Sequence, residues 1–304
     1  MTIPAAVFIG QAYPVRASAG LRLGRVAARN PAPSPGVYPI DTGTAELAAI
    51  GGGWLLSING AESSHIDPDD PSRLDFEYMR QMVVLADDRF PSGPRCPRVL
   101  HLGAAACALP RYFDHRHRGG ARQVAVEIDA ALAAYAREWF DLPRSPALRI
   151  RVGEARTVVE QLTPRTRDLV IRDAFNGERA PGHLTTVEFT EAVAALLDDG
   201  GLYLVNCADD RRLTLARTEL ATIGNVFEHV VAVADAAMLK GRRTGNVVIG
   251  ASRAPIDVTP ALTRALLADP QPAQILDDTR ARALAGTAVP LRDADLRAGA
   301  GQIV

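Results

Sequence analysis

The chain has 304 residues, 47% of them hydrophobic, and a formal net charge of −1, so it can bury a sizeable core in one large domain or in one domain with a smaller companion. This charge balance indicates neither nucleic acid nor a membrane surface as a partner. No stretch approaches the ~20 apolar residues of a spanning helix, and the N-terminus lacks a basic signal segment, so we expect a cytoplasmic protein.

The first 95 residues divide into two parts. Residues 1–45 are rich in Pro, Gly and Arg and predict an extended arm, partly strand and partly mobile. Residues 46–95 predict a β-hairpin and a linking helix. Asn59-Gly60 lies between two strand-like runs, and both positions of such a turn need positive φ, for which Asn-Gly is well suited. The helix is expected over residues 71–86.

Residues 96–252 alternate between strand and helix patterns, which predicts an α/β domain with a mostly parallel, Rossmann-like sheet of seven strands. The predicted strands are 98–102, 122–127, 148–152, 168–172, 201–207, 227–234 and 245–251. The predicted helices are 129–140, 155–162, 185–198 and 211–223, with Asp129 at an N-cap position. Residues 253–304 predict a helical tail, with helices from Thr259-Pro260 and near 273–285 and no strand.

The stretch around Gly103 carries the first functional signal. An apolar strand breaks at Gly103 into small residues beginning with Ala104, and the next strand ends in Glu127. A βαβ unit that holds a nucleoside has this order of elements: a strand, a turn of small residues, a helix, a second strand and an acid. The acid binds the ribose hydroxyls. A turn with one glycine argues against NAD, so we expect a ligand without phosphates, such as S-adenosylmethionine or a relative. An ordinary buried βαβ unit with a chance acid remains the alternative.

Two further acids follow predicted strands. Glu154 and Asp173 stand where ligands meet the carboxyl ends of a parallel sheet, although acids at such positions also cap helices and turns. The loop after Asp173, AFNGERAPGHL, is long for a simple connection and suggests a lid. His101 lies inside an apolar strand and is expected to be a core histidine. The three cysteines and the histidines have no metal spacing, so no metal is expected.

At this point the motifs resemble the spermidine synthase family, the polyamine aminopropyltransferases, and in particular their actinobacterial branch. The resemblance covers residues 54–252. It rests on DPDDPSRLDFEYMRQM after the hairpin, VLHLGAAACALPRYF, VEID with GEA, RDLVIRDAFNGERAPGHL and the closing GRRTGNVVIGAS. It implies a sheet of the S-adenosylmethionine-methyltransferase type with a small N-terminal β-hairpin region, and a homodimer.

The resemblance also implies site roles. The co-substrate would be decarboxylated S-adenosylmethionine and the acceptor a small amine such as a diamine. Glu127 would hold the ribose, Glu154 would face the adenine amino group, Asp173 would be the catalytic base and Tyr78 would line the acceptor tunnel. The expected nucleoside site comprises Gly103, Ala104, Glu127, Ile128, Glu154 and Ala155. The expected acceptor site comprises Tyr78, Asn176 and Ser63.

The chain departs from the family pattern where cations are bound. The family's Gly-Gly-Gly-Asp-Gly turn ends here in Ala106-Cys107. Ala106 therefore stands where the family has the acid that binds the aminopropyl ammonium. Asn176 replaces the second acid of the gate loop, and Ser63 replaces a glutamine of the hairpin. Two alternatives therefore stay open: methyl transfer from S-adenosylmethionine in the same fold, and a non-catalytic nucleoside-binding homologue.

Overall fold

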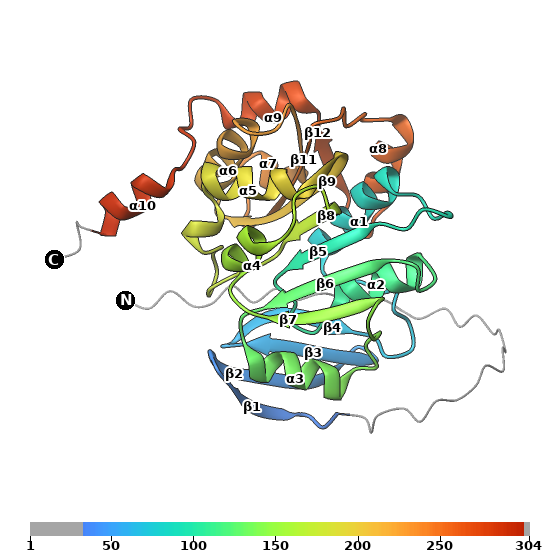
Figure 1. Ribbon diagram of the computed structural model, residues 1–304. Helices are drawn as coiled ribbons and strands as arrows, with labels where there is room; N and C mark the ends of the chain where they lie inside the picture. The colour runs from blue at the N-terminus through green and yellow to red at the C-terminus, as the bar shows by residue number, and fades with distance from the viewer. Residues whose placement is uncertain (1–32, 301–304) are drawn as a thin grey trace.

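The structure, a computed structural model, describes residues 33–300 and contains two β-sheets (Figure 1). The smaller sheet is antiparallel, in the order β1-β2-β3-β4. Its strands are β1 (Gly36–Ile40), β2 (Gly43–Ile50), β3 (Gly53–Ile58) and β4 (Ala61–Ile66). The predicted hairpin is confirmed: β3 and β4 pair across Asn59 and Gly60, both with positive φ.

The main sheet has eight strands within the described residues, in the order β12-β10-β11-β9-β8-β5-β6-β7. The strands β9, β8, β5, β6 and β7 run parallel, and the other three join antiparallel. Their bounds are β5 (Arg98–Leu102), β6 (Arg122–Glu127), β7 (Leu148–Val152), β8 (Arg167–Arg172), β9 (Leu197–Asp209), β10 (His229–Asp235), β11 (Gly245–Ser252) and β12 (Ala273–Leu276). All seven strands predicted between residues 98 and 252 are present.

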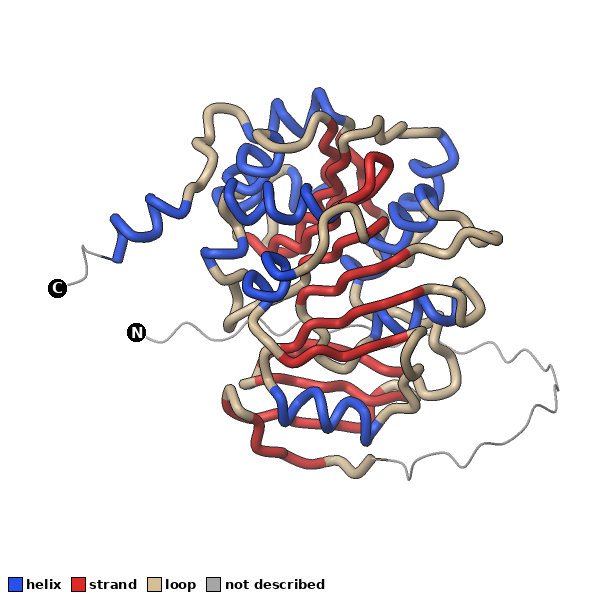
Figure 2. Tube along the Cα trace, in the orientation of Figure 1, coloured by secondary structure: helices blue, strands red, loops and turns tan. Residues whose placement is uncertain are grey.

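Helices cover both faces of the main sheet because its strands are apolar on both sides. Val99 packs into one core and its neighbour Leu100 into the other. The first core also holds the smaller sheet and the helices α1 (Glu77–Arg89), α2 (Ala108–Arg116), α3 (Ala130–Trp139) and α8 (Pro260–Leu267). The second holds α4 (Ala155–Gln161), α5 (Val187–Leu196), α6 (Thr214–Gly224) and α9 (Asp278–Ala285). Figure 2 shows the two helical layers flanking the strands.

Three short elements complete the described part of the chain. They are the 3₁₀ turn η1 (Gly182–Leu184), α7 (Ala236–Leu239) and α10 (Asp293–Ala300), which projects from the body in Figure 1.

His101 is a core histidine, as predicted: it is buried in β5, and its Nε2 lies 2.9 Å from Oε1 of Gln123. Burial lowers its pKa to about 4. No helix in the described part is long and apolar enough to cross a membrane.

The linking helix begins later than predicted. It starts at Glu77 and not at Pro71, because the preceding segment uses its acids to close turns. The Asp67 carboxylate accepts hydrogen bonds from the backbone N–H groups of Asp69 and Asp70, at 2.9 and 3.1 Å. Such local side-chain bonds compete with helix formation.

Both ends of the described chain also differ from prediction. Residues 36–45 of the predicted arm form strand, as was expected for part of it, but they belong to a sheet, as β1 and the start of β2, and Thr42 donates from its N–H and hydroxyl to Oδ2 of Asp129, at 2.7 and 2.8 Å. The rest of the predicted arm, residues 1–32, lies outside the described residues. The tail contains a strand, β12, which pairs with β10 where we expected only helix. Four residues paired on one side give too short a pattern to recognise in sequence.

Candidate active site

Five parallel strand ends meet at one edge of the main sheet, and they bring the predicted residues together. Because β9, β8, β5, β6 and β7 are parallel neighbours, their carboxyl ends share that edge. Asp173 follows β8, Gly103 follows β5, Glu127 ends β6, and Glu154 lies two residues beyond β7.

The turn after β5 has the backbone shape that glycine favours, although it contains one glycine. Gly103 has φ +93°, and Ala105 and Cys107 have φ 43° and 62°. A Cβ on Gly103 would lie 2.2 Å from the carbonyl oxygen of Asp173, which no side chain could tolerate. The turn therefore packs directly against the strand end that carries Asp173.

Glu127 is buried and holds this turn in place. Its Oε2 accepts hydrogen bonds from the N–H groups of Ala104 and Ala105, at 3.2 and 3.0 Å, and its Oε1 accepts one from the N–H of Asp129, at 3.1 Å. A carboxylate has about four lone-pair positions. Three are in use, so Glu127 has one acceptor position left for a ligand hydroxyl.

Exposed apolar side chains lie beside these acids. Ile128 directly follows Glu127 and is 61% exposed, Val152 at the end of β7 is 51% exposed, and Phe175 beyond β8 is 37% exposed. Exposed apolar side chains at the mouth of a polar site suit the faces of a planar base.

The Asp129 carboxylate caps α3 by accepting from the N–H of Leu132, as predicted.

Glu154 caps α4, as the alternative interpretation predicted. Its carboxylate accepts from the N–H groups of Arg156 and Thr157, at 2.9 and 2.8 Å, and from the Thr157 hydroxyl at 3.1 Å. Its Oε1 also lies 2.9 Å from Nε2 of His183 in η1. Burial alone would raise the pKa of Glu154, but these hydrogen bonds lower it to about 2, so it is ionised at neutral pH. Ala155 is buried in the first turn of α4.

The Asp173 carboxylate accepts hydrogen bonds from two side chains and does not cap a helix or a turn. Its Oδ2 accepts from the Tyr78 hydroxyl at 3.0 Å, and its Oδ1 accepts from Nδ2 of Asn206 at 2.9 Å. No backbone N–H of the described residues donates to this carboxylate, so the capping interpretation of Asp173 is wrong. Burial raises the pKa of Asp173, and the bonds from Asn206 and Tyr78 offset this only in part. Burial also raises the pKa of Tyr78, which keeps its hydroxyl a donor.

Sequence reasoning missed Asn206. It is buried in β9, and its Oδ1 has no hydrogen-bond partner among the described residues. The rule that selected Asp173, a polar residue at the carboxyl end of a parallel strand, also selects Asn206, which ends the apolar run 202–205. An unpaired buried acceptor is costly unless a ligand donates to it.

The residues expected around an amine are less well assembled. The Ser63 hydroxyl donates to the carbonyl of Ala61, whereas buried Ser64 faces the turn, 3.4 Å from the N–H of Ala106. Ala106 itself is fully buried. Asn176 is exposed in the loop after Asp173, and its backbone forms an isolated antiparallel β-bridge with that of Arg179.

The sequence also offers Glu62, Asp67 and Glu178 as acids that could replace the one lost at Ala106. Asp67 pairs with Arg73 at 3.2 Å, while Glu62 and Glu178 are exposed.

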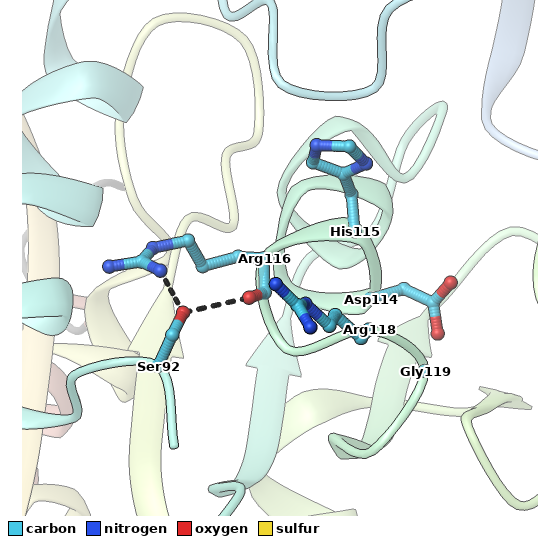
Figure 3. A pocket seen from close by; sticks show the side chains of 6 residues that line it. All are labelled: Ser92, Asp114, His115, Arg116, Arg118 and Gly119. Atoms are coloured by element: carbon cyan, nitrogen blue, oxygen red, sulfur yellow. Dashed lines mark hydrogen bonds between the residues drawn. The ribbon is translucent and has the colours of Figure 1, made fainter.

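Two surface hollows lie away from this edge. One, of about 610 Å³, lies at the end of α2 and is lined by Ser92, Asp114, His115, Arg116, Arg118 and Gly119 (Figure 3). The other, of about 550 Å³, includes Arg98, Arg122 and Asp168 at the amino ends of the strands. Neither includes a residue of the carboxyl edge. We therefore locate the candidate site from strand topology and from the contacts of Asp173.

Comparison with known proteins finds a likeness over most of the chain. The chain is 42% identical to a solved structure described as a probable spermidine synthase from Corynebacterium glutamicum. The two superpose with a TM-score of 0.81, covering 86% of this chain and 97% of that one. No family model matches the chain.

Curated relatives match over shorter segments. A polyamine aminopropyltransferase from Vibrio vulnificus is 31% identical over 163 residues, which is 53% of this chain and 52% of the relative. An N-terminal histidine N-methyltransferase from Emericella nidulans is 34% identical over 106 residues, 34% of this chain and 19% of the relative. The chain thus spans about half the length of the first curated relative and much less of the second.

Proposed function

Because the chain belongs to the spermidine synthase family, a family of transferases, we propose that it moves an aminopropyl group from decarboxylated S-adenosylmethionine to a small diamine or polyamine. The observation that carries this proposal is the environment of Asp173. Its carboxylate is held by Tyr78 and Asn206 and has a raised pKa, and it lies beside the turn after β5, the turn that in this proposal admits the nucleoside. A base with a pKa moved toward neutrality is better matched to removing a proton from an amine.

The reaction needs few groups from the protein. The amine lone pair attacks the methylene carbon next to the sulfonium, the carbon–sulfur bond breaks, and its electron pair stays on sulfur to leave neutral methylthioadenosine. The new secondary amine carries one proton too many, and in this proposal Asp173 accepts it. The sulfonium already activates the carbon, so the remaining contribution of the protein is to align the amine with it.

The nucleoside end has groups of suitable chemistry. The open acceptor position of Glu127 can take one ribose hydroxyl, which is one direct bond and not the pair that a diol could offer. Ile128, Val152 and Phe175 provide apolar contacts for the adenine. Glu154 is ionised and can accept from the adenine amino group if that group displaces one of its present donors.

A second candidate function follows from Ala106. A primary ammonium on the transferred group needs an anion, and the position where the family has one is a buried alanine. S-adenosylmethionine carries its ammonium beside a carboxylate and so places less demand on this position. Methyl transfer is therefore the second candidate, and the likeness to a histidine N-methyltransferase agrees with it.

The test compares binding with turnover. Calorimetry would measure the affinity of the wild-type protein for methylthioadenosine, S-adenosylmethionine and its decarboxylated form. Turnover would then be followed with decarboxylated S-adenosylmethionine and a panel of diamines. Aminopropyl transfer to any diamine supports the proposal. Binding of methylthioadenosine and S-adenosylmethionine without aminopropyl transfer would reject it and leave methyl transfer and a non-catalytic nucleoside-binding protein, and no nucleoside binding would reject all three.

A further inference from the structure

His183 contacts the carboxylate that the proposed function assigns to the adenine. It lies in η1, at the far end of the long loop that follows Asp173, and its Nε2 is 2.9 Å from Oε1 of Glu154. The two side chains are 44% and 35% exposed, so a ligand can reach this contact from solvent.

Glu154 has no acceptor position to spare while His183 is bound. Oε1 accepts from the N–H of Arg156 and from His183, and Oε2 accepts from the N–H and the hydroxyl of Thr157. These four bonds use about all the lone-pair positions of a carboxylate. An amino group that is to donate to Glu154 must therefore displace one of the four.

His183 is the partner that can leave. The bonds from Arg156 and Thr157 cap the first turn of α4, and breaking them would leave helix N–H groups unsatisfied. The imidazole of His183 makes no other hydrogen bond or ion pair with the described residues, and its side chain faces solvent.

The backbone of His183 is fixed, so the side chain can turn without moving the loop. Arg156 donates to the carbonyl oxygen of His183 at 3.2 Å. The same guanidinium forms two bonds, of 2.7 and 2.5 Å, to the carboxylate of Asp293 at the start of α10. Leu296 of α10 packs against Gly182, where an added Cβ would be 3.0 Å from it. The C-terminal segment thus anchors η1 beside Glu154.

We propose that His183 is a specificity-determining residue for the base: it holds Glu154 in the free protein, and a base with an exocyclic amino group takes its place. This inference rests on the proposed function, which assigns Glu154 to the adenine. A base with a carbonyl at the same position offers an acceptor in place of a donor, so it cannot replace His183 on a carboxylate. Selection of amino over carbonyl bases then comes from competition as well as from the acid itself.

The test measures the affinity of His183→Ala for methylthioadenosine and for methylthioinosine by calorimetry. His115→Ala is the matched control, because His115 is exposed at the end of α2, in the hollow that lies away from the carboxyl edge, and its imidazole makes no hydrogen bond with the described residues (Figure 3). Removing the competing bond should tighten methylthioadenosine binding by about three- to tenfold in His183→Ala. Methylthioinosine affinity, and both affinities in His115→Ala, should not change.

The outcomes separate this inference from the function on which it rests. Equal or weaker methylthioadenosine binding by a folded His183→Ala protein, with wild-type binding intact, would overturn the inference alone. An equal gain for methylthioinosine would also overturn it, because the effect would then not involve an amino group. Absence of methylthioadenosine binding by the wild type would overturn the proposed function and this inference together.

Discussion

Replacing Asp173 with asparagine removes a proton acceptor and leaves its surroundings almost intact. The asparagine oxygen can still accept from Asn206, and the Tyr78 hydroxyl can rotate to accept from the new amide group, so both contacts of the wild-type carboxylate have a counterpart. The amide cannot take a proton at neutral pH. Loss of a positioned general base lowers turnover by ~10²–10⁴-fold. Methylthioadenosine affinity should change little, because the nucleoside contacts proposed above do not involve Asp173.

The stability of Asp173→Asn has a definite sign. Burial raises the pKa of Asp173 above its unfolded value. An acid with a raised pKa contributes the most stability below its unfolded pKa, and this contribution is lost as the pH rises through the folded pKa. Asparagine carries no charge to bury. The variant should therefore be at least as stable as the wild type at pH 7–8, and the difference should shrink in acid.

The assay is turnover with decarboxylated S-adenosylmethionine and diamines, beside the melting temperature of each protein from pH 4 to 8. Asp199→Asn is the control: it removes a carboxylate that is 75% exposed and pairs with Arg165 at the other edge of the sheet, so its turnover should match the wild type. Wild-type turnover in a folded Asp173→Asn protein would show that Asp173 is not the base. A large fall in its melting temperature at pH 8 would refute the argument about burial.

Three other variants follow from the same contacts. Asn206→Leu removes a donor to Asp173, so the pKa of Asp173 should rise further and the acid limb of the kcat/KM profile should move to higher pH; an unmoved limb would contradict this. Ala106→Asp restores the family acid at a fully buried position and should lower the free energy of unfolding by at least ~2 kcal/mol, measured in urea, without restoring affinity for an aminopropyl cation. Glu127→Gln should weaken methylthioadenosine binding at least about tenfold and also lower the melting temperature, because the turn loses a charged acceptor; unchanged affinity would remove Glu127 from the site.

The parts of the fold that depend on local pattern were predictable from sequence. Seven apolar runs of strand length gave the seven strands between residues 98 and 252, and Asn59-Gly60 gave the hairpin. The shared edge of parallel strands is a geometric rule, which is why Glu127 and Asp173 were expected near one another. The homodimer stays a prediction.

The remaining features depend on contacts between distant parts of the chain. The strand β12 is recognisable only from its pairing with β10, and the late start of α1 depends on turns closed by Asp67 and Asp70. His183 meets Glu154 from 29 residues away, in a contact that the anchoring of η1 by the C-terminal segment supports. No periodicity or motif in the sequence records such a contact.

The turn after β5 shows why some family glycines could be lost and one could not. At Ala105 and Cys107 a side chain costs only the strain of a left-handed backbone, ~1–2 kcal/mol each. At Gly103 a side chain would collide with the carbonyl of Asp173 and push the turn away from the base. The retained glycine therefore fixes the distance between this turn and Asp173, whereas in the proposed function the change to Ala106 affects only how a cationic tail is held. The proposed nucleoside binding and the proposed amine chemistry thus depend on different parts of the turn, so experiments that measure each by itself are needed to assign the reaction.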